Sequence, residues 1–207
     1  MKTVSPASST RWLLPMIALL SLFVGCEKST YESPEYKVVE KEGSFEIRDY
    51  PELTIVSTPM QKRGEDGSFM RLFRFISGRN ERSQKISMTT PVLMTGAESG
   101  IMSFIVPKDV ARQGVPTPSN PEVTISTKPP ARYAVYRFSG PSKPIPSQEA
   151  AKKLLAWVDA KHLEISASPS PLPLYAYYNP PWTPGFMRRN EVLLRLAPLA
   201  TKVPAHR

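Results

Sequence analysis

The chain has one cysteine and two histidines in 207 residues. With Cys26 alone, it cannot form an internal disulfide or a cysteine metal cluster. The two histidines, His162 and His206, give no Ser-His-Asp arrangement and no ligand set with metal spacing. The 64–67 stretch (GEDG) lacks the Gly-Lys-Ser/Thr that completes a phosphate-binding loop. These absences exclude the commonest catalytic and metal-binding arrangements, and we predict no catalytic residue and no metal site.

Long hydrophobic runs are also absent, except one near the start, from Trp12 to Phe23. Lys2 and Arg11 are the only charges before it, and small residues follow it, which is typical of a secretory signal too short to span a bilayer comfortably. Its end, FVGC, resembles a bacterial lipobox with Phe23 where leucine is usual. We therefore predict a signal peptide over 1–25 and a lipid on Cys26. The alternatives are an ordinary signal peptide with a chance cysteine, and a membrane-anchoring helix.

Acidic residues are outnumbered, with 18 Asp and Glu against 27 Lys and Arg. Such an excess of positive charge favours anionic partners such as lipid headgroups or propionate-bearing ligands. Most of these charged side chains are nevertheless expected to lie on a solvated surface. No nucleic-acid motif accompanies the charge, so we predict no nucleic-acid partner. The 26–35 stretch is polar and is expected to tether the domain to the membrane of a bacterial cell envelope.

Apolar periodicity predicts an α+β domain over 36–197 and a flexible tail over 198–207. Strands and helices are expected in the order strand, strand, helix, strand, strand, which then recurs. We expect two pseudo-symmetric ββαββ halves forming a distorted β-barrel with two external helices. The expected strands cover 36–42, 45–50, 53–58, 85–94, 101–106, 122–127, 131–138, 174–178 and 190–196, and the expected helices cover 69–77 and 146–163.

Each expected helix carries one apolar stripe at helical spacing. In the first helix the stripe is Phe69, Leu72, Phe73 and Ile76, and such a stripe is more often core than a ligand shelf. In the second helix the residues expected on one face are Ala151, Leu154, Leu155 and Val158.

Seven segments, in order along the chain, resemble the SOUL heme-binding protein family. Three carry most of the signal: the helix ending Gly-x-Asn, the Met-Thr-x-Pro-Val block, and the Pro-Pro block followed by Asn-Glu-Val. The segments are YKVV (36–39), FEIRDYP (45–51), FMRLFRFISGRN (69–80), KISMTTPV (85–92), MSFIVP (102–107), YRFSG (136–140) and YNPPW (178–182) followed by RNEV (189–192).

The resemblance implies a distorted barrel that binds heme or a related tetrapyrrole non-covalently near the first helix. Carried onto this chain, the contact residues are Phe69, Met70, Phe73 and Arg74. Aromatic side chains suit a flat macrocycle, and an arginine suits a propionate, although Arg74 is about as well explained as a solvated side chain.

The sequence offers few axial ligands for heme iron, because the first of the two predicted ββαββ halves contains no histidine. His162, near the end of the second helix, is better explained by capping and packing than as an iron ligand. We therefore expect weak, hydrophobically driven binding. The alternatives are a binder of another apolar molecule, an interaction module, or a hydrolase that uses Glu191. For Glu191 itself, a buried carboxylate that accepts hydrogen bonds from loop amides is the simpler expectation.

Overall fold

The structure is a computed structural model, and it describes residues 31–62, 65–96, 99–167 and 173–198. These residues form nine strands, three α-helices and the short 3₁₀ helix η2 (Gly185–Met187). The strands are β1 (Lys37–Glu42), β2 (Phe45–Tyr50), β3 (Leu53–Met60), β4 (Val92–Thr95), β5 (Gly100–Ile105), β6 (Thr124–Lys128), β7 (Ala131–Phe138), β8 (Leu174–Tyr177) and β9 (Asn190–Arg195). The helices are α1 (Ser68–Ile76), α2 (Lys108–Gln113) and α3 (Pro144–Ala160).

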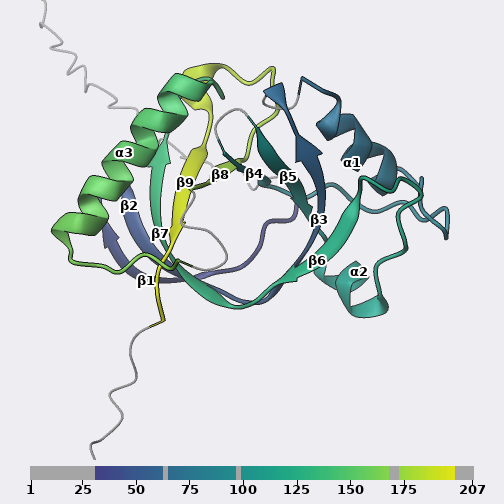
Figure 1. Cartoon of the computed structure of the whole chain (residues 1–207), viewed down its shortest axis with the longest axis horizontal. Helices are drawn as coiled ribbons and strands as arrows, with labels where there is room; N and C mark the ends of the chain where they lie inside the picture. The colour runs from purple at the N-terminus through teal and green to yellow at the C-terminus, as the bar shows by residue number, and fades with distance from the viewer. Residues whose placement is uncertain (1–30, 63–64, 97–98, 168–172, 199–207) are drawn as a thin grey trace, which may run out of the picture.

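All nine strands belong to one antiparallel sheet with the order β1-β2-β7-β9-β8-β4-β5-β3-β6. The sheet curves strongly, and α3 and α1 lie outside it at opposite ends (Figure 1). β1 and β6 each pair on one side only, so the sheet is open at both edges. The α+β class is confirmed, but the expected barrel is not, because no ladder joins β1 to β6 in the described part of the chain.

The core has three parts, two outside the curve of the sheet and one inside. Beneath α3, Ile47, Val192 and Leu194 pack with the helix. Beneath α1 lie residues of β3 and β5, including Val56 and Phe104. The inner, concave face of the sheet carries the third cluster, which is Tyr50, Ile55, Leu93, Ile105, Val135, Ala176 and Leu193. Most strands therefore bury both faces.

β2 shows this double burial most clearly. Its alternating sequence, FEIRDY, predicts one apolar face toward the core and one charged face toward solvent. Ile47 does lie in the core under α3, yet Arg48, on the opposite face, is only 2% exposed. The charged face of this strand points into the concavity rather than into water.

The buried face of α1 differs from the predicted stripe. Leu72, Phe75 and Ile76 are buried, whereas Phe69 and Phe73 are exposed by 39% and 41%. Successive helical residues are rotated by about 100°, which puts Ser68 between the directions of Phe75 and Leu72 and turns Phe73 outward. The interpretation of the whole stripe as core therefore holds for Leu72 and Ile76 but is wrong for Phe69 and Phe73.

The buried face of α3 is shifted as well. Ala150, Ala151, Leu154, Trp157 and Val158 are buried against β7 and β9. The predicted Leu155 is instead 43% exposed, because Trp157 and Ala150 widen the buried face on the other side of Leu154.

The predicted strand over 85–94 is mostly irregular. Only β4 forms there, directly after Pro91, which has no N–H to give to a ladder. Before it, Ile86 packs in the core under α1, and the Thr89 hydroxyl donates to the Ile105 carbonyl at 2.6 Å. The short helix α2 was not predicted.

The predicted signal segment 1–25, Cys26 and residues 199–207 lie outside the described residues. Of the expected tether, residues 31–35 are described, and they lie against the domain. Thr90 donates its N–H to the Glu32 carbonyl at 2.8 Å. None of the described helices has the length and hydropathy needed to cross a membrane.

Candidate ligand-binding site

The helix α1 is fixed in place by the loop that precedes it. Gly67 adopts a φ of 82°, in the left-handed region that favours glycine, directly before the first helical residue. The Asp66 carboxylate accepts the N–H groups of Gln61 at 3.0 Å and Ser68 at 3.1 Å. Burial opposes ionisation of Asp66, but these hydrogen bonds lower its pKa to about 2. The start of the helix is thereby tied to the end of β3.

The outward face of α1 presents apolar side chains to solvent. Phe69, Met70 and Phe73 are exposed by 39%, 44% and 41%. The rings of Phe69 and Phe73 are nearly parallel, with centroids 6.1 Å apart and an interplanar angle of 13°. Phe69 also contacts the buried Phe104 edge-to-face at 5.3 Å, which holds its ring in place. The result is a small, ordered aromatic surface.

A basic hollow lies further round α1 from this aromatic surface, and Arg74, one turn after Met70, links the two. The hollow has a volume of about 320 Å³, and Arg71, Arg74 and Arg79 line it. Arg71 is held by Asp66 at 3.2 Å, but within the described ranges no carboxylate lies within ion-pair distance of Arg74 or Arg79. By helical geometry Arg74 lies next to Met70 on the outward face. The four predicted contact residues are thus neighbours on one face, and one of them, Arg74, has no acidic partner among the described residues; the same holds for Arg79 nearby.

His162 lies far from this face. It follows α3 with a φ of 52°, its backbone N–H donates to the Asp159 carbonyl at 2.9 Å, and its side chain is exposed. Because α3 and α1 lie at opposite ends of the sheet (Figure 1), the structure does not bring His162 to the predicted contact residues. Within residues 31–198, gaps excepted, no three His, Cys, Asp or Glu side chains are grouped as metal ligands would be.

Glu191 is fully buried inside the concavity, but its partners are not loop amides. Arg48 donates to both carboxylate oxygens, at 2.8 and 3.1 Å, and Arg189 donates to Oε1 at 2.7 and 3.0 Å. The Tyr178 hydroxyl donates to Oε2 at 2.9 Å. Arg48 is also bound by Glu46 at 2.7 Å. The expectation of amide partners is therefore corrected to a buried ion-pair cluster.

The electrostatics of this cluster keep its carboxylate and guanidinium groups charged and the Tyr178 hydroxyl neutral. Burial raises the pKa of the Glu191 carboxyl, but the two guanidinium groups outweigh it and lower the pKa below its usual value. Burial and the Glu191 charge raise the pKa of the Tyr178 hydroxyl. A carboxylate held by two arginines is a poor general base, because its proton affinity is reduced. Sequence reasoning missed Arg48 and Arg189, because the charge alternation of β2 is typical of a half-exposed strand and Arg189 lies just before β9.

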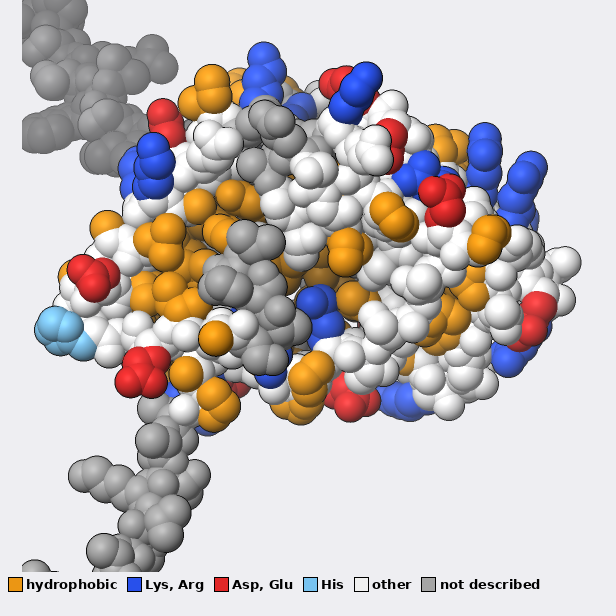
Figure 2. Space-filling view, in the orientation of Figure 1, with side chains coloured by type: hydrophobic (Ala, Val, Ile, Leu, Met, Phe, Trp, Pro, Cys, Tyr) orange, Lys and Arg blue, Asp and Glu red, His pale blue; other side chains and the backbone are white. Residues whose placement is uncertain are grey.

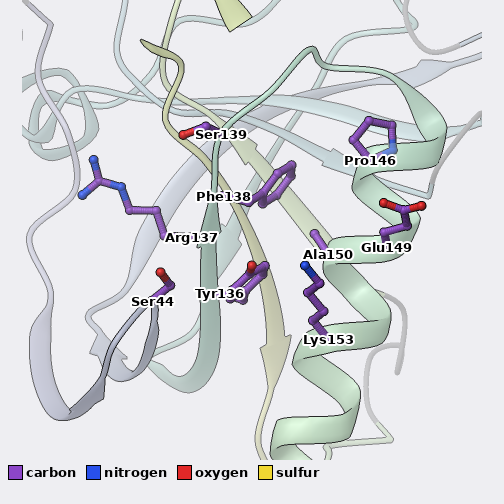
Figure 3. A pocket seen from close by; sticks show the side chains of 9 residues that line it. All are labelled: Ser44, Tyr136, Arg137, Phe138, Ser139, Pro146, Glu149, Ala150 and Lys153. Carbon is purple, nitrogen blue, oxygen red and sulfur yellow. The ribbon is translucent and has the colours of Figure 1, made fainter. Parts of the chain in front are cut away.

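A further hollow lies between α3 and β7, with a volume of about 440 Å³. Figure 3 shows Tyr136 and Phe138 of β7 and Lys153 of α3 around the same space, with Arg137 on the other side of the strand. The rings of Tyr136 and Phe138 are 6.3 Å apart and nearly parallel. None of the predicted contact residues lines this hollow.

Comparison with known proteins gives both a family and a fold. A family model described as SOUL heme-binding protein matches residues 31–195. Heme-binding protein 2 of Mus musculus is 30% identical over 146 residues, which cover 63% of this chain and 71% of that protein.

Solved structures with a similar fold share little sequence with the chain. The EcmrR C-terminal domain has a TM-score of 0.52 at 12% identity, with 78% of this chain and 98% of that chain covered. A hydrolase from Listeria innocua has a TM-score of 0.51 at 12% identity, covering 77% and 94%. EcmrR in a DNA complex has a TM-score of 0.56 at 10% identity, covering 73% of this chain but only 56% of that one. At such identities the likeness shows the fold alone.

Proposed function

Because the chain belongs to the SOUL heme-binding protein family, we propose that it binds heme or a related tetrapyrrole on the outward face of α1. One observation carries the proposal. Phe69, Met70 and Phe73 are exposed on α1, and Arg74, one helical turn after Met70, also lines a hollow of about 320 Å³ together with Arg71 and Arg79. An apolar surface next to uncompensated positive charge matches a flat macrocycle that bears carboxylates.

The proposed contact residues make two kinds of interaction with the ligand, apolar contact and hydrogen bonding to its carboxylates. Phe69 and Phe73 offer ring surface to the macrocycle, and Met70 offers a polarisable thioether beside them. Arg74 is placed to hydrogen-bond a propionate, with Arg79 adding positive charge. None of the four contact residues is a histidine or cysteine, so the proposal places the binding energy in apolar contact and charge rather than in iron coordination.

Titration of hemin into the purified protein, followed by the Soret band, tests this proposal. We expect saturable one-to-one binding. Phe73→Ala should weaken it about 2- to 13-fold, through loss of aromatic contact worth about 0.5–1.5 kcal/mol. Arg74→Ala should weaken it about tenfold, through loss of a charge-assisted hydrogen bond. Iron-free protoporphyrin IX, followed by fluorescence, should bind with similar affinity.

Two matched variants control for nonspecific effects. Leu155→Ala removes an exposed apolar side chain from α3, and Arg112→Ala removes an exposed arginine from α2. Both should leave the hemin affinity unchanged. Hemin binding that never saturates, or that all four variants weaken equally, contradicts a tetrapyrrole site on α1 and favours another apolar ligand for the domain.

We propose in addition that the protein is anchored to the bacterial cell envelope by a lipid on Cys26. The support is the basic start, the apolar run and the FVGC end of the first 26 residues. Cells expressing the full chain and fed radiolabelled palmitate should yield a labelled protein in the membrane fraction. Cys26→Ser should abolish the label and release the protein from the membrane. A wild-type chain that stays unlabelled would refute the anchor.

A further inference from the structure

The loop between β8 and β9 and the start of α3 carry the most exposed large apolar side chains of the described residues. In the loop, Trp182, Phe186 and Met187 are exposed by 82%, 81% and 63%. In α3, Ile145 is exposed by 68%, whereas the next most exposed such residue, Ile101, reaches only 47%. Large apolar side chains gathered in solvent usually mark contact with another molecule.

The two segments that bear these side chains lie side by side. The Gly140 N–H donates to the Gly185 carbonyl at 2.9 Å, and the Asn190 side chain donates to the Gly140 carbonyl at 2.9 Å. A Cβ on Gly185 would lie 3.4 Å from the Pro141 nitrogen, so the loop packs closely on the residues before α3. Figure 2 shows hydrophobic side chains projecting at the upper edge of the view, with basic side chains next to them. We call the four exposed apolar side chains the apolar tip.

The conformation of the loop is held from within. The rings of Pro180, Pro181 and Pro184 restrict its backbone. Arg188 donates from Nε to the Thr183 carbonyl at 2.7 Å and from Nη2 to the Pro181 carbonyl. Since the loop is already ordered, the apolar tip can bind without a large loss of backbone entropy.

The charge around the apolar tip is positive. Lys143, Arg188 and Arg189 flank it, and the stretches 139–147 and 179–189 contain no aspartate or glutamate. Arg189 is neutralised by the buried carboxylate of the cluster in the sheet. Across the residues that the structure describes, neither Lys143 nor Arg188 forms an ion pair. An apolar surface bordered by uncompensated basic groups matches an anionic lipid surface.

The segment that precedes β1 runs beside the base of this loop. The Arg189 guanidinium donates to the Tyr36 hydroxyl at 3.3 Å, and Pro34 and Tyr178 line the same small cavity. Five peptide units separate Cys26 from the first described residue, and they span at most about 18 Å. The lipid proposed for Cys26 would therefore keep the domain at the surface of a bilayer.

We propose that the apolar tip is a membrane-docking surface, which inserts Trp182 and Phe186 into the headgroup region of an anionic lipid bilayer. Aromatic side chains, tryptophan above all, favour this interfacial layer, and Lys143 and Arg188 then lie at the level of the phosphate groups. The basic border and the nearby start of the chain favour a bilayer over a protein partner. Because α1 lies at the other end of the sheet (Figure 1), docking leaves the α1 face in water and does not depend on tetrapyrrole binding.

Fluorescence of the full chain on vesicles of phosphatidylethanolamine and phosphatidylglycerol tests the proposal. Subtracting the emission of Trp182→Phe isolates Trp182, because Trp12 and Trp157 emit in both proteins. We expect Trp182 emission to shift to shorter wavelength, and lipids brominated near the headgroup to quench it more than lipids brominated at the chain ends. The signal comes from Trp182 alone, so it separates docking of the apolar tip from the proposed lipid anchor.

Vesicle flotation measures the contribution of the apolar tip to affinity. Phe186→Ser should weaken binding about tenfold, and Lys143→Ala should weaken it about fivefold on anionic vesicles only. The matched controls are Leu155→Ser, about 15 Å further along α3 from the apolar tip, and Lys85→Ala, an exposed lysine near the end of α1. Both controls should bind vesicles as the wild type does. Hemin affinity should be unchanged in Phe186→Ser.

Three results would each overturn the proposal. The first is a vesicle-bound chain whose Trp182 emission is neither shifted nor quenched, a result that leaves the lipid anchor standing. The second is equal vesicle affinity for Phe186→Ser and Leu155→Ser. The third is a Trp182 shift that grows with protein concentration without vesicles, which would assign the apolar tip to contact between copies of the chain. Melting temperatures of the variants, expected to match the wild type because these side chains lie in solvent, exclude loss of the fold as the cause.

Discussion

Replacing Glu191 by glutamine is expected to destabilise the fold by about 3–5 kcal/mol, the usual cost of leaving a buried charge without its partner. Glu191 has no exposed surface and neutralises both Arg48 and Arg189. Glutamine keeps the shape but removes the charge, so two guanidinium groups remain inside the concavity with Glu46 as the nearest acid. Urea unfolding followed by circular dichroism measures the loss.

The matched control is the ion pair of Asp49 and Arg132, which joins β2 to β7 at 2.7 Å but is 40% and 31% exposed. Asp49→Asn should cost less than about 1 kcal/mol. The double variant Arg48→Met with Glu191→Leu should lose clearly less than the sum of the two single variants, since it removes both charges together. Additive losses, or equal losses in Asp49→Asn and Glu191→Gln, would contradict a coupled buried cluster.

The same cluster has a defined pH dependence. The folded-state pKa of Glu191 is lowered, so its stabilising contribution is complete above the unfolded value of about 4.3. The contribution is lost as the pH falls through the lower, folded-state pKa. Glu191→Gln has no carboxyl at this position, so its stability should fall less steeply than that of the wild type over this acidic range.

Replacing Phe75 by alanine is expected to cost about 3–5 kcal/mol, whereas Phe73→Ala should cost about 1 kcal/mol or less. Both residues are phenylalanines of α1, and they differ in the direction in which their side chains point. Phe75 is 2% exposed beneath the helix, and Phe73 is 41% exposed above it. Thermal and urea unfolding of the two variants, measured side by side, gives the comparison.

Phe69→Ala is the intermediate case, because its ring contacts both Phe73 and the buried Phe104. The free energy of unfolding lost in Phe69→Ala should fall between the losses in Phe73→Ala and Phe75→Ala. A larger loss for Phe73→Ala than for Phe75→Ala would mean that the helix buries the face predicted from the sequence. In that event the aromatic surface proposed for tetrapyrrole binding would not exist.

Strand positions were largely predictable, because β-branched runs bounded by proline and glycine mark them locally. The predicted 131–138 strand matches β7, and most other strands differ by one or two residues at their ends. The strand before Pro91 failed for a local reason, since Thr90 donates its backbone N–H to the Glu32 carbonyl and the Thr89 hydroxyl donates to the Ile105 carbonyl, so this stretch pairs with no strand of the sheet.

The helix faces were not predictable, because α1 has too few polar residues to mark its solvent side. Of the residues from Phe69 to Ile76 only Arg71 and Arg74 are polar, and Arg71 lies flat against the loop and bonds Asp66. Two apolar stripes are therefore compatible with the sequence. Packing on β3 and β5 chooses between them, and that packing depends on contacts distant in the chain.

The partners of Glu191 depend on contacts still more distant. Arg48 precedes Glu191 by 143 residues, and only the pairing of β2 with β7 and of β7 with β9 brings them together. Charge alternation in β2 is typical of a half-exposed strand, so sequence periodicity points away from a buried arginine. Such a pair becomes visible only when the strand order is known.

The open edges of the sheet also bear on self-association of the protein. β1 and β6 each leave one line of backbone N–H and C=O groups unpaired by any described strand, and such a line can template pairing with another molecule. β1 is exposed along its whole length, carries Lys37, Glu40, Lys41 and Glu42, and has an irregular register between Val38 and Glu40. Charges and an irregular register therefore oppose the addition of another molecule's strand at the β1 edge.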